Sequence, residues 1–237
     1  MPAGDISAAI LERYRKVAIS PIEDVLRGKG YINIFMQKVD NLTPGKRIVG
    51  RARTLRYLPS RPDFMADLPG GEKWLPYQAM SLCGPGDVLV VDAAFHTEVG
   101  VAGDVMLLQL KMAGAEGIVT DGGLRDLHQV AAYGLKVFAG GVTHRGAPPV
   151  IIPSDFNEPI QCGGTLVRPG DIVVGDNNGL LVVPKSQAEE VIAAAEEREQ
   201  MEEFVIKRIQ DERCIPGRYY PITPQVAELY RKNTGKK

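Results

Sequence analysis

The sequence predicts an α/β protein with a parallel strand–helix–strand unit, a turn-rich antiparallel part and a long final helix. Two apolar runs of strand length, Val88–Val91 and Gly117–Thr120, flank a helical stretch over about 104–113. Short β-branched runs separated by Gly, Pro, Asp and Asn fill residues 151–183. A charged helical pattern then continues to about Glu212. Together these patterns favour the α/β class.

The composition is that of an ordinary globular chain. The 237 residues are 44% hydrophobic and 24% charged, and no run of about 18 apolar residues could cross a bilayer. Lys and Arg number 28 against 29 Asp and Glu, so the net charge of -1 supplies no positive field for nucleic acid or a membrane surface. We expect neither partner. Met1–Lys16 lacks the apolar core of a secretory signal, which predicts a cytoplasmic protein.

The cysteines predict neither a disulfide framework nor a zinc site. Cys83, Cys162 and Cys214 are odd in number and far apart, and no C-x-x-C spacing joins them. We therefore expect free, unreactive thiols.

The first third of the chain predicts two helices, a strand and a loop. Apolar residues at helical spacing predict a helix over 7–18, which Ser20-Pro21 interrupts, and a second short helix near Pro21. β-Branched and aromatic residues predict a strand over 45–58. Arg61–Gly71 is rich in Pro, Gly and Asp and is expected to be a loop, with a possible helix over 74–82.

The middle third predicts a βαβ unit. The helix over 104–113 is apolar on nearly every side, so we expect it inside the protein. The strand at 117–120 leads directly into the turn Asp121-Gly122-Gly123-Leu124-Arg125-Asp126, and a short strand follows at 136–139. Strand, helix and strand in this order predict a parallel pair.

The last third predicts an antiparallel meander and a helical arm. Short strands are expected at 151–152, 165–167, 172–174 and 180–183. Ser186-Gln187-Ala188-Glu189 has the pattern of a capping box that opens the long helix. At about 1.5 Å per residue this helix exceeds one small core. We therefore divide the chain into an α/β domain over 1–185 and a C-terminal arm over 186–237 that contacts a neighbouring subunit.

The turn that follows the second buried strand is the strongest candidate site. Ligands gather at the carboxyl ends of parallel strands, and two glycines there permit a sharp turn and close approach. Arg125 offers a planar cation and Asp126 a hard oxygen ligand, a pair suited to an oxyanion beside a divalent metal. The alternative is purely structural, with Asp126 as a helix N-cap.

A second candidate element opens the apolar helix. Gly103-Asp104 precedes backbone N–H groups that have no partner within the helix and that carry the positive end of its dipole, an environment that favours a carboxylate. The alternative is that Asp104 is a plain N-cap. Whether this helix start meets the Arg125-Asp126 turn depends on how the two strands place their ends.

These residues carry a family resemblance. The segments Gly103-Asp104-Val105-Met106-Leu107-Leu108 and Gly114–Asp126 resemble the signature of the RraA-like family, and the similarity extends over most of the chain, through Gly50-Arg51-Ala52 and Pro169-Gly170-Asp171 to Gly175–Gly179. That family contains class II pyruvate aldolases acting on 4-hydroxy-4-methyl-2-oxoglutarate and 4-carboxy-4-hydroxy-2-oxoadipate. It also contains the non-catalytic regulator of ribonuclease E activity. The resemblance implies an α-β-β-α sandwich of the swivelling β/β/α type, assembled as a homotrimer or homohexamer.

The resemblance also implies roles for individual residues. Asp126 matches the metal-binding aspartate, Arg125 the arginine that contacts the pyruvyl group, and Asp104 the acid that orders metal-bound water. The pyruvate carboxylate would bind at Gly103 and at the amides of Val105 and Met106. A glutamate of the long helix would enter the neighbouring subunit's site; Glu202 fits, although Glu199 and Glu203 lie close enough to confuse the match. The shorter regulators typically lack this helix, which favours the enzyme.

Three features depart from the family pattern. The loop Ser60–Trp74 is long, and His96 and His144 match no family position; we expect these two to be loop or surface residues rather than ligands. His128 could lie at the rim of the pocket. These differences leave the substrate specificity open.

The favoured interpretation is an Mg²⁺- or Mn²⁺-dependent lyase that cleaves a 4-hydroxy-2-oxo acid to pyruvate and a second carbonyl compound. The metal and Arg125 would stabilise an enolate, and a base associated with Asp104 or Glu202 would accept the C4 hydroxyl proton. No Lys lies between Gly114 and Asp126, and oxaloacetate decarboxylation is an expected side activity. Two alternatives remain: a non-catalytic regulator that binds a ribonuclease, and a metal-dependent lyase for a sugar-derived 2-oxo acid.

Overall fold

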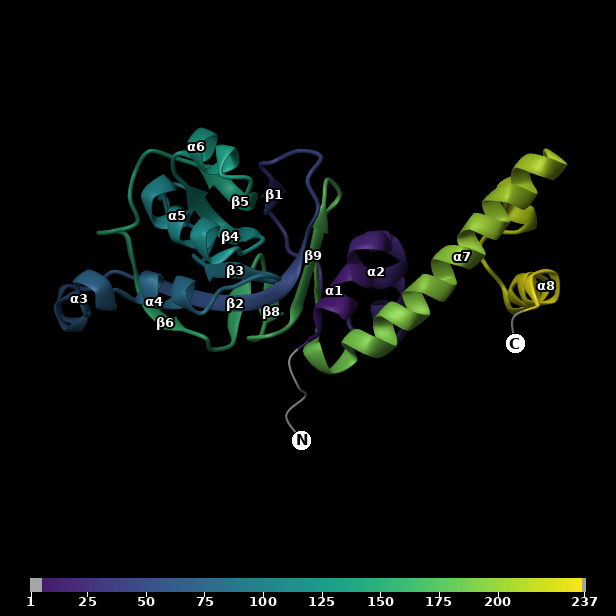
Figure 1. Cartoon of the computed structure of the whole chain (residues 1–237), viewed down its shortest axis with the longest axis horizontal. Coiled ribbons are helices and arrows are strands. Elements are labelled where there is room, and N and C mark those ends of the chain that lie inside the picture. Colours follow the sequence, from purple (N-terminus) through teal and green to yellow (C-terminus); the bar gives the residue numbers. More distant parts are fainter. Residues whose placement is uncertain (1–5, 236–237) are drawn as a thin grey trace.

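The computed structural model describes residues 6–235, and most of its strands belong to one large mixed sheet (Figure 1). This sheet has eight strands in the order β1-β5-β4-β3-β2-β9-β10, with β6 paired to the far end of β2, and β7 and β8 form a separate hairpin. The strands are β1 (Asp40–Asn41), β2 (Ile48–Pro59), β3 (Asp87–Asp92), β4 (Gly117–Leu124), β5 (Lys136–Val142), β6 (Ile151–Phe156), β7 (Ile160–Cys162), β8 (Thr165–Val167), β9 (Ile172–Asp176) and β10 (Gly179–Val183). The predicted α/β class is confirmed.

The helices form two groups, towards opposite ends of the long strand β2 (Figure 1). One group lies beside β3, β4 and β5, and the other packs beside β9 and continues into the C-terminal arm. The helices are α1 (Ala8–Lys16), α2 (Ile19–Gly28), α3 (Pro62–Asp67), α4 (Leu75–Ser81), α5 (Asp104–Ala113), α6 (Leu127–Ala132), α7 (Ala188–Glu212) and α8 (Pro224–Thr234).

The predicted βαβ unit is confirmed. Strands β3 and β4 pair in parallel with Leu89 opposite Ile118, and α5 connects them. Strand β4 is longer than expected, because it continues through the two glycines to Leu124 with an irregularity in its pairing to β5 between Thr120 and Gly123. The Arg125-Asp126 turn therefore lies past the end of an eight-residue buried strand.

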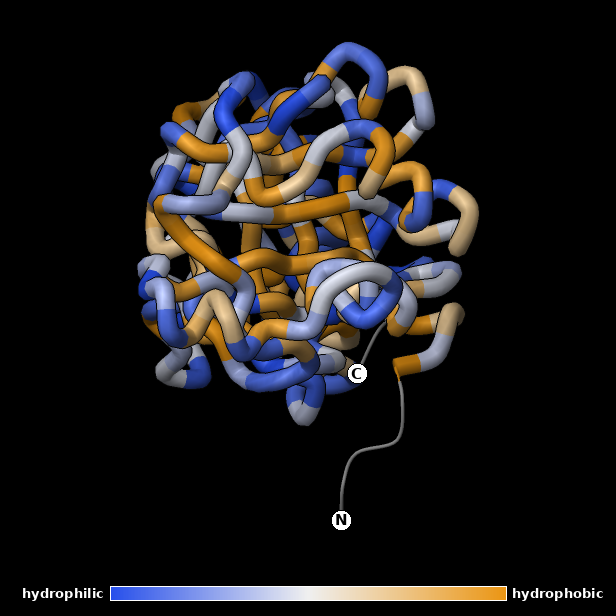
Figure 2. Tube along the Cα trace, turned by 90° about the vertical axis from the view of Figure 1, so that its left-hand side faces the viewer, coloured by the Kyte–Doolittle hydropathy of each residue, from blue (hydrophilic) through white to orange (hydrophobic). Residues whose placement is uncertain are grey.

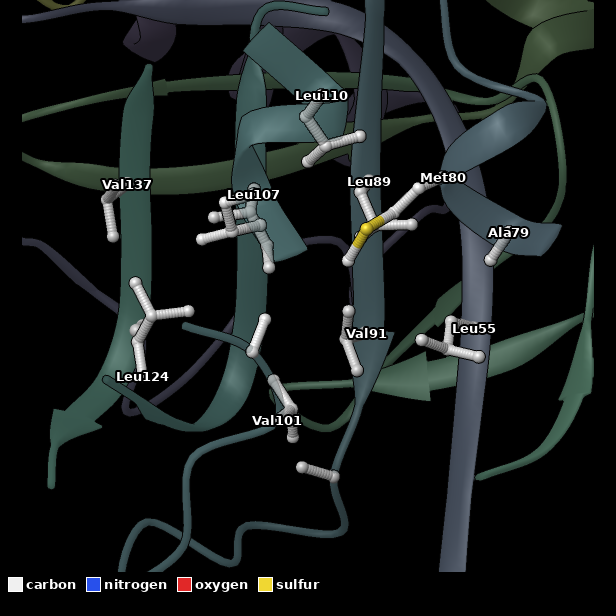
Figure 3. Close-up of a cluster of buried hydrophobic side chains, with 14 of the residues drawn as sticks. Leu55, Ala79, Met80, Leu89, Val91, Val101, Leu107, Leu110, Leu124 and Val137 are labelled. Carbon is white, nitrogen blue, oxygen red and sulfur yellow. The ribbon is translucent and has the colours of Figure 1, made fainter. Parts of the chain in front are cut away.

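The surroundings of α5 differ from the prediction. Leu107 and Leu110 are buried against the sheet with Leu89 and Val137 (Figure 3), but Val105, Leu108 and Met112 are exposed in this chain. The helix is an outer layer over one sheet face, so only the side that faces the strands is covered. Its apolar outer stripe, Val105-Leu108-Met112, has no partner in the described chain.

The predicted meander is only partly correct. Strands β9 and β10 form an antiparallel hairpin, but β7 and β8 form their own hairpin and β6 pairs with β2. The reason is the length of β2: its first half pairs with β9 and its second half with β6. The segment Arg61–Gly71, expected to be a loop, contains the short helix α3.

Hydrophobic residues concentrate in the strands at the centre of the α/β body, while the connecting loops are more hydrophilic (Figure 2). A cluster under α4 and α5 includes Leu55, Leu89 and Leu107, and a second under α1, α2 and α7 includes Tyr14, Val174 and Val191. Every side chain of β3 and β4 is buried. The Arg125-Asp126 turn thus directly follows a strand that is buried along its whole length.

The C-terminal arm is present, although its start differs from the prediction. Residues 185–187 form a short 3₁₀ helix and no side chain caps α7, so the predicted capping box is wrong. The core of the body continues past residue 185 as far as Ala195. Beyond it, Arg198 still pairs with Asp24 of α2, and Glu199 accepts from the Ala18 N–H. The rest of α7 extends away from the sheet and packs with the C-terminal segment through Val205, Tyr219 and Val226 (Figure 1).

The cysteines are free, as expected, and burial raises the pKa of Cys83 to about 12. In the described range 6–235, no helix is long and apolar enough to span a membrane.

Gly117, the first residue of β4, provides a test of this packing. A Cβ there would lie 2.0 Å from the Lys136 carbonyl oxygen of the neighbouring strand, and neither backbone can retreat easily. We expect Gly117→Ala to lower the free energy of unfolding by at least about 1–3 kcal/mol, the usual cost of overpacking. Urea unfolding would measure this. Gly28→Ala, where nothing lies within 4 Å, is the matched control, and equal stability of the two variants would contradict the packing.

Candidate functional site

The candidate site forms where the loop after β3 lies beside the end of β4. Gly100 forms a parallel bridge with Gly123, and the Val101 N–H donates to the Gly123 carbonyl at 3.0 Å. The Arg125 N–H returns a hydrogen bond to the Ala102 carbonyl, also at 3.0 Å. The loop therefore continues the sheet for a few residues, and it brings the start of α5 against the Arg125-Asp126 turn.

Gly100 determines where the side chain of Arg125 lies. A Cβ on Gly100 would be 2.5 Å from Arg125 Cγ, so the aliphatic stem crosses the glycine in direct contact. One guanidinium nitrogen lies 3.9 Å from where a Cβ on Gly146 would be. Arg125 is exposed, and within residues 6–235 it has no ion pair. A positioned arginine without a carboxylate partner is suited to an external anion.

Asp126 has an unusual backbone conformation. Its φ of 55° and ψ of 36° place it in the left-handed region, which aspartate tolerates better than most side chains. It occupies the N-cap position of α6, yet its side chain makes no capping hydrogen bond. Instead Oδ2 accepts from the Asp104 N–H at 3.4 Å, and a Cβ on Gly103 would lie 2.5 Å from that oxygen. The carboxylate is thus directed toward α5, and the N-cap alternative does not describe it.

Asp104 is the first residue of α5, and Gly103 takes the N-cap position instead. Asp104 Oδ1 accepts from the Val105 N–H at 2.7 Å. Two carboxylates therefore lie at the positive end of the α5 dipole, which stabilises their negative charge. A substrate carboxylate that binds the Val105 amide, as the resemblance implies, would have to replace that of Asp104.

A cavity of about 200 Å³ opens between these elements. Three of the residues predicted for substrate binding, Gly103, Met106 and Arg125, line it, whereas Asp104, Val105 and Asp126 lie outside its lining. The other lining residues come from β2, from the start of α4, and from the loops around 100 and 147; they are Tyr57, Trp74, Gly100, Val101, Ala102, Gly146, Ala147 and Pro148.

Two buried aspartates hold the loop that carries Gly100. Asp121, which is fully buried, accepts from the Ala93 N–H at 2.8 Å and from Gln161 Nε2 at 2.9 Å. Gln161 also donates to Asp92, whose other partner is the Ala94 N–H at 3.0 Å. Burial, together with the charge of Asp121, raises the pKa of Asp92. These bonds fix the start of the loop over 93–103.

Glu202 belongs to the second half of α7, and α7 projects away from β4, the strand that precedes Arg125 (Figure 1). It pairs with Arg198 at 3.4 Å, and partial burial raises the pKa of its carboxyl despite that arginine. Glu199 accepts from the Ala18 N–H at 2.8 Å and so serves the packing of α7, while Glu203 is exposed. One chain alone therefore does not bring Glu202 into the site.

The histidines lie outside the cavity lining. His96 Nδ1 is 2.7 Å from Glu98 Oε1, and this hydrogen bond lowers the pKa of Glu98. His144 and His128 are exposed. The lining residues include no histidine, so the expectation that His128 could lie at the rim of the pocket is not supported.

The donor set near the cavity fits a hard cation better than a zinc ion. No group of three or more His, Cys, Asp or Glu side chains within residues 6–235 is arranged to hold a metal. Zinc sites need three or four such ligands, whereas Mg²⁺ retains several waters and needs only one or two carboxylates. Asp126, with Asp104 beside it, supplies such a set.

The part of the lining formed by Tyr57 and Trp74 was not predicted. Tyr57 and Trp74 come from segments far from the motif in sequence, and only tertiary packing brings them to Arg125. The unexpected length of the segment Ser60–Trp74 was the one available signal, because its last residue is the wall residue.

Comparison with known proteins agrees with this geometry. The model of the RraA-like family, described as Aldolase/RraA, matches residues 19–182. A protein of Halalkalibacterium halodurans named "Putative 4-hydroxy-4-methyl-2-oxoglutarate aldolase" is 31% identical over 201 residues, which cover 85% of this chain and 89% of that protein.

Solved structures give the same assignment. RraAS2 of Streptomyces coelicolor, described as an unusual member of the RNase ES inhibitor RraA family, superposes with a TM-score of 0.78 at 31% identity, over 86% of this chain and 99% of that one. An uncharacterised protein of Pseudomonas syringae shares the fold over 98% of this chain and 97% of its own, with a TM-score of 0.77 at 24% identity. The chain therefore belongs to the RraA-like family.

Proposed function

We propose that this protein is a divalent-metal-dependent carbon–carbon lyase that cleaves a 4-hydroxy-2-oxo acid to pyruvate and a second carbonyl compound. The observation that carries the proposal is the unpaired guanidinium of Arg125 in a small cavity beside the carboxylates of Asp126 and Asp104. The aldolase names given to relatives support the same reaction class. The defining experiment is pyruvate release over a panel of 4-hydroxy-2-oxo acids, with and without a chelator.

Arg125 would bind the anionic end of the substrate. Cleavage breaks the C3–C4 bond, the bonding electrons pass to C3, and negative charge develops on the C2 oxygen. A fixed guanidinium stabilises that charge more in the transition state than in the substrate, which is the requirement for rate enhancement. Oxaloacetate decarboxylation passes through the same enolate, so it is a proposed side activity.

Asp126 would hold Mg²⁺ or Mn²⁺, with Asp104 nearby. When bound, such a cation supplies Lewis-acid stabilisation of the oxygen on which charge develops. The left-handed backbone of Asp126 and the absence of a side chain at Gly103 together aim the carboxylate away from α6. Asp104 would accept or relay the C4 hydroxyl proton that leaves as the second carbonyl forms.

Glu202 is proposed to complete the site of a neighbouring subunit in a homotrimer or homohexamer. Two observations support such an assembly: the far half of α7 projects from its own body, and α5 presents the unpartnered apolar stripe Val105-Leu108-Met112 beside the site. The raised pKa of Glu202 suits a proton acceptor. The arm over 186–237 would then be the contact between subunits.

A second candidate function is a non-catalytic regulator that binds a ribonuclease. The name of the Streptomyces coelicolor relative favours it, since that relative matches this chain as closely as the named aldolase does. A chain that releases no pyruvate from any 2-oxo acid, with or without metal, would support the regulator. Release of pyruvate from a sugar-derived 2-oxo acid alone would favour a lyase of that third class.

Loss of either charged group should abolish most activity. We expect Arg125→Ala and Asp126→Asn each to lower kcat at least about a hundredfold, the scale for removing a charge-stabilising group. Coupled pyruvate assays would measure this. Arg27→Ala, an exposed arginine of α2 far from the cavity in sequence, is the control, and wild-type turnover by either site variant would remove that residue from the mechanism.

Gly103→Ala should damage the site without unfolding the chain. Its φ of -132° suits alanine, but the new Cβ would meet Asp126 Oδ2 at 2.5 Å and displace the carboxylate. We expect kcat to fall at least about tenfold, because small misplacements of a catalytic group are costly. The midpoint temperature of thermal unfolding should stay near that of the control Gly84→Ala, whose added Cβ would have no atom within 4 Å. Unchanged kcat would show that the position of Asp126 is unimportant.

Co-expression of two inactive chains tests whether a site is built from two subunits. Arg125→Ala chains retain Glu202, and Glu202→Gln chains retain Arg125, so mixed assemblies should regain about a quarter of the wild-type activity by random pairing. Glu203→Gln is the matched control and should be active alone. Mixed assemblies as inactive as the separate variants would contradict a shared site.

A further inference from the structure

The lining of the cavity combines one charged side chain with mostly apolar residues. Arg125 is the only side chain in its lining that carries a charge. The apolar side chains of the lining are those of Trp74, Val101, Met106, Ala147 and Pro148. Arg61 pairs with Asp63 at 2.6 Å and Arg56 with Asp155 at 3.7 Å. Lys73 and Arg145, the chain neighbours of Trp74 and Gly146, are exposed and do not belong to the lining.

Tyr57, the lining residue with a hydroxyl group, adds no charge to the lining of the cavity. Its hydroxyl donates to the Val101 carbonyl at 3.1 Å, and only 3% of the residue is exposed. Burial raises the pKa of this phenol further above its ordinary value, so it remains neutral. The phenol therefore adds no charge to the lining, and its proton is already used in the hydrogen bond to Val101.

Trp74 belongs to a fixed wall. It directly precedes α4, and its backbone N–H donates to the Gly71 carbonyl at 3.1 Å. Gln109 of α5 ties α4 down, with Nε2 donating to the Tyr77 carbonyl at 3.2 Å and to Ser81 Oγ at 2.8 Å. Met106 lies one helical turn before Gln109 on the same helix. The tryptophan and methionine are thus held as two parts of one apolar surface.

A substrate that fits this cavity has an anionic end for Arg125 and an uncharged end for the apolar lining. When the 2-oxo acid end binds Arg125, the charged residue of the lining, the substituent on C4 is left to the uncharged remainder of the lining. A carboxylate there would lose water without gaining a partner, which is strongly unfavourable. The substrate in the names of the relatives, 4-hydroxy-4-methyl-2-oxoglutarate, carries carboxylates at both ends. The volume of about 200 Å³ also lies below that of typical drug-sized pockets, so the substituent must be small.

We infer that the substrate is a 4-hydroxy-2-oxo acid whose C4 substituent is a small uncharged apolar group, and that Trp74 sets this preference. The inference rests on the proposed lyase function. The second product is then an apolar aldehyde or ketone rather than a second oxo acid. The C4 hydroxyl loses its proton, the C3–C4 bond breaks, and C3 regains a proton to give pyruvate, so no further reactant is required.

The test compares 4-hydroxy-2-oxohexanoate, which would yield pyruvate and propanal, with 4-hydroxy-4-methyl-2-oxoglutarate. We expect the wild-type protein, assayed with Mg²⁺, to favour the hexanoate at least about tenfold in kcat/KM. Trp74→Arg places a cation in the wall and should shift the ratio at least about tenfold toward the dicarboxylate, mainly through KM. Trp74→Phe keeps an apolar ring and should retain the preference.

Met106→Lys provides a second charge at the same wall from a different element, so the result does not depend on the folding of one variant. Thermal unfolding of each variant confirms that it is folded. A wild-type preference for the dicarboxylate, or a ratio that neither cation variant changes, would overturn the inference while leaving the lyase proposal intact. No pyruvate from either compound or from the wider panel would overturn the proposed function itself, and the inference with it.

Discussion

The candidate site depends on close contact between charged side chains and backbone that carries no side chain. Arg125 crosses Gly100, and the Asp126 carboxylate lies against Gly103. Any larger residue at either glycine would occupy the space of the functional group. The hydrogen bonds between Gly123 and Val101 and between Arg125 and Ala102 hold the two segments at that distance. The loop after β3 and the turn after β4 therefore act as one rigid unit.

The surrounding fold stabilises the strained backbone of this site. Asp126 holds a left-handed conformation that non-glycine residues adopt with some strain, and Ala94 and Phe95 do so in the loop that carries Gly100. The buried pair Asp92 and Asp121, bridged by Gln161, satisfies the backbone at the start of that loop. Strands β3 and β4, buried along their whole length, provide the base. Such strain is retained where the surrounding structure over-determines it, which is typical of functional sites.

Local patterns predicted those parts of the molecule that local forces determine. The boundaries of α5 follow from an apolar run between glycines, and β3 and the start of β4 from short apolar runs. Arg125 and Asp126 were therefore correctly expected past the end of a buried strand, although β4 continues through Asp121–Leu124, which were expected to form the turn. Pairing that depends on the bent strand β2 was not predictable, and the expected meander was partly wrong for that reason. The exposed stripe on α5 shows the same limit, because an all-apolar helix can lie inside a chain or between chains. Trp74 and Tyr57 reach the cavity only through tertiary packing.

The central claim is that Arg125 and a cation held by Asp126 act on one anion. Oxalate, a planar dianion shaped like the enolate of pyruvate, is a direct probe of it. Calorimetric titration of oxalate with Mg²⁺ into the wild type, Arg125→Ala, Asp126→Asn and the double variant gives the coupling energy of the pair. The account predicts that the losses are non-additive by at least about 0.5 kcal/mol. Strictly additive losses, or oxalate binding that neither substitution weakens, would contradict it.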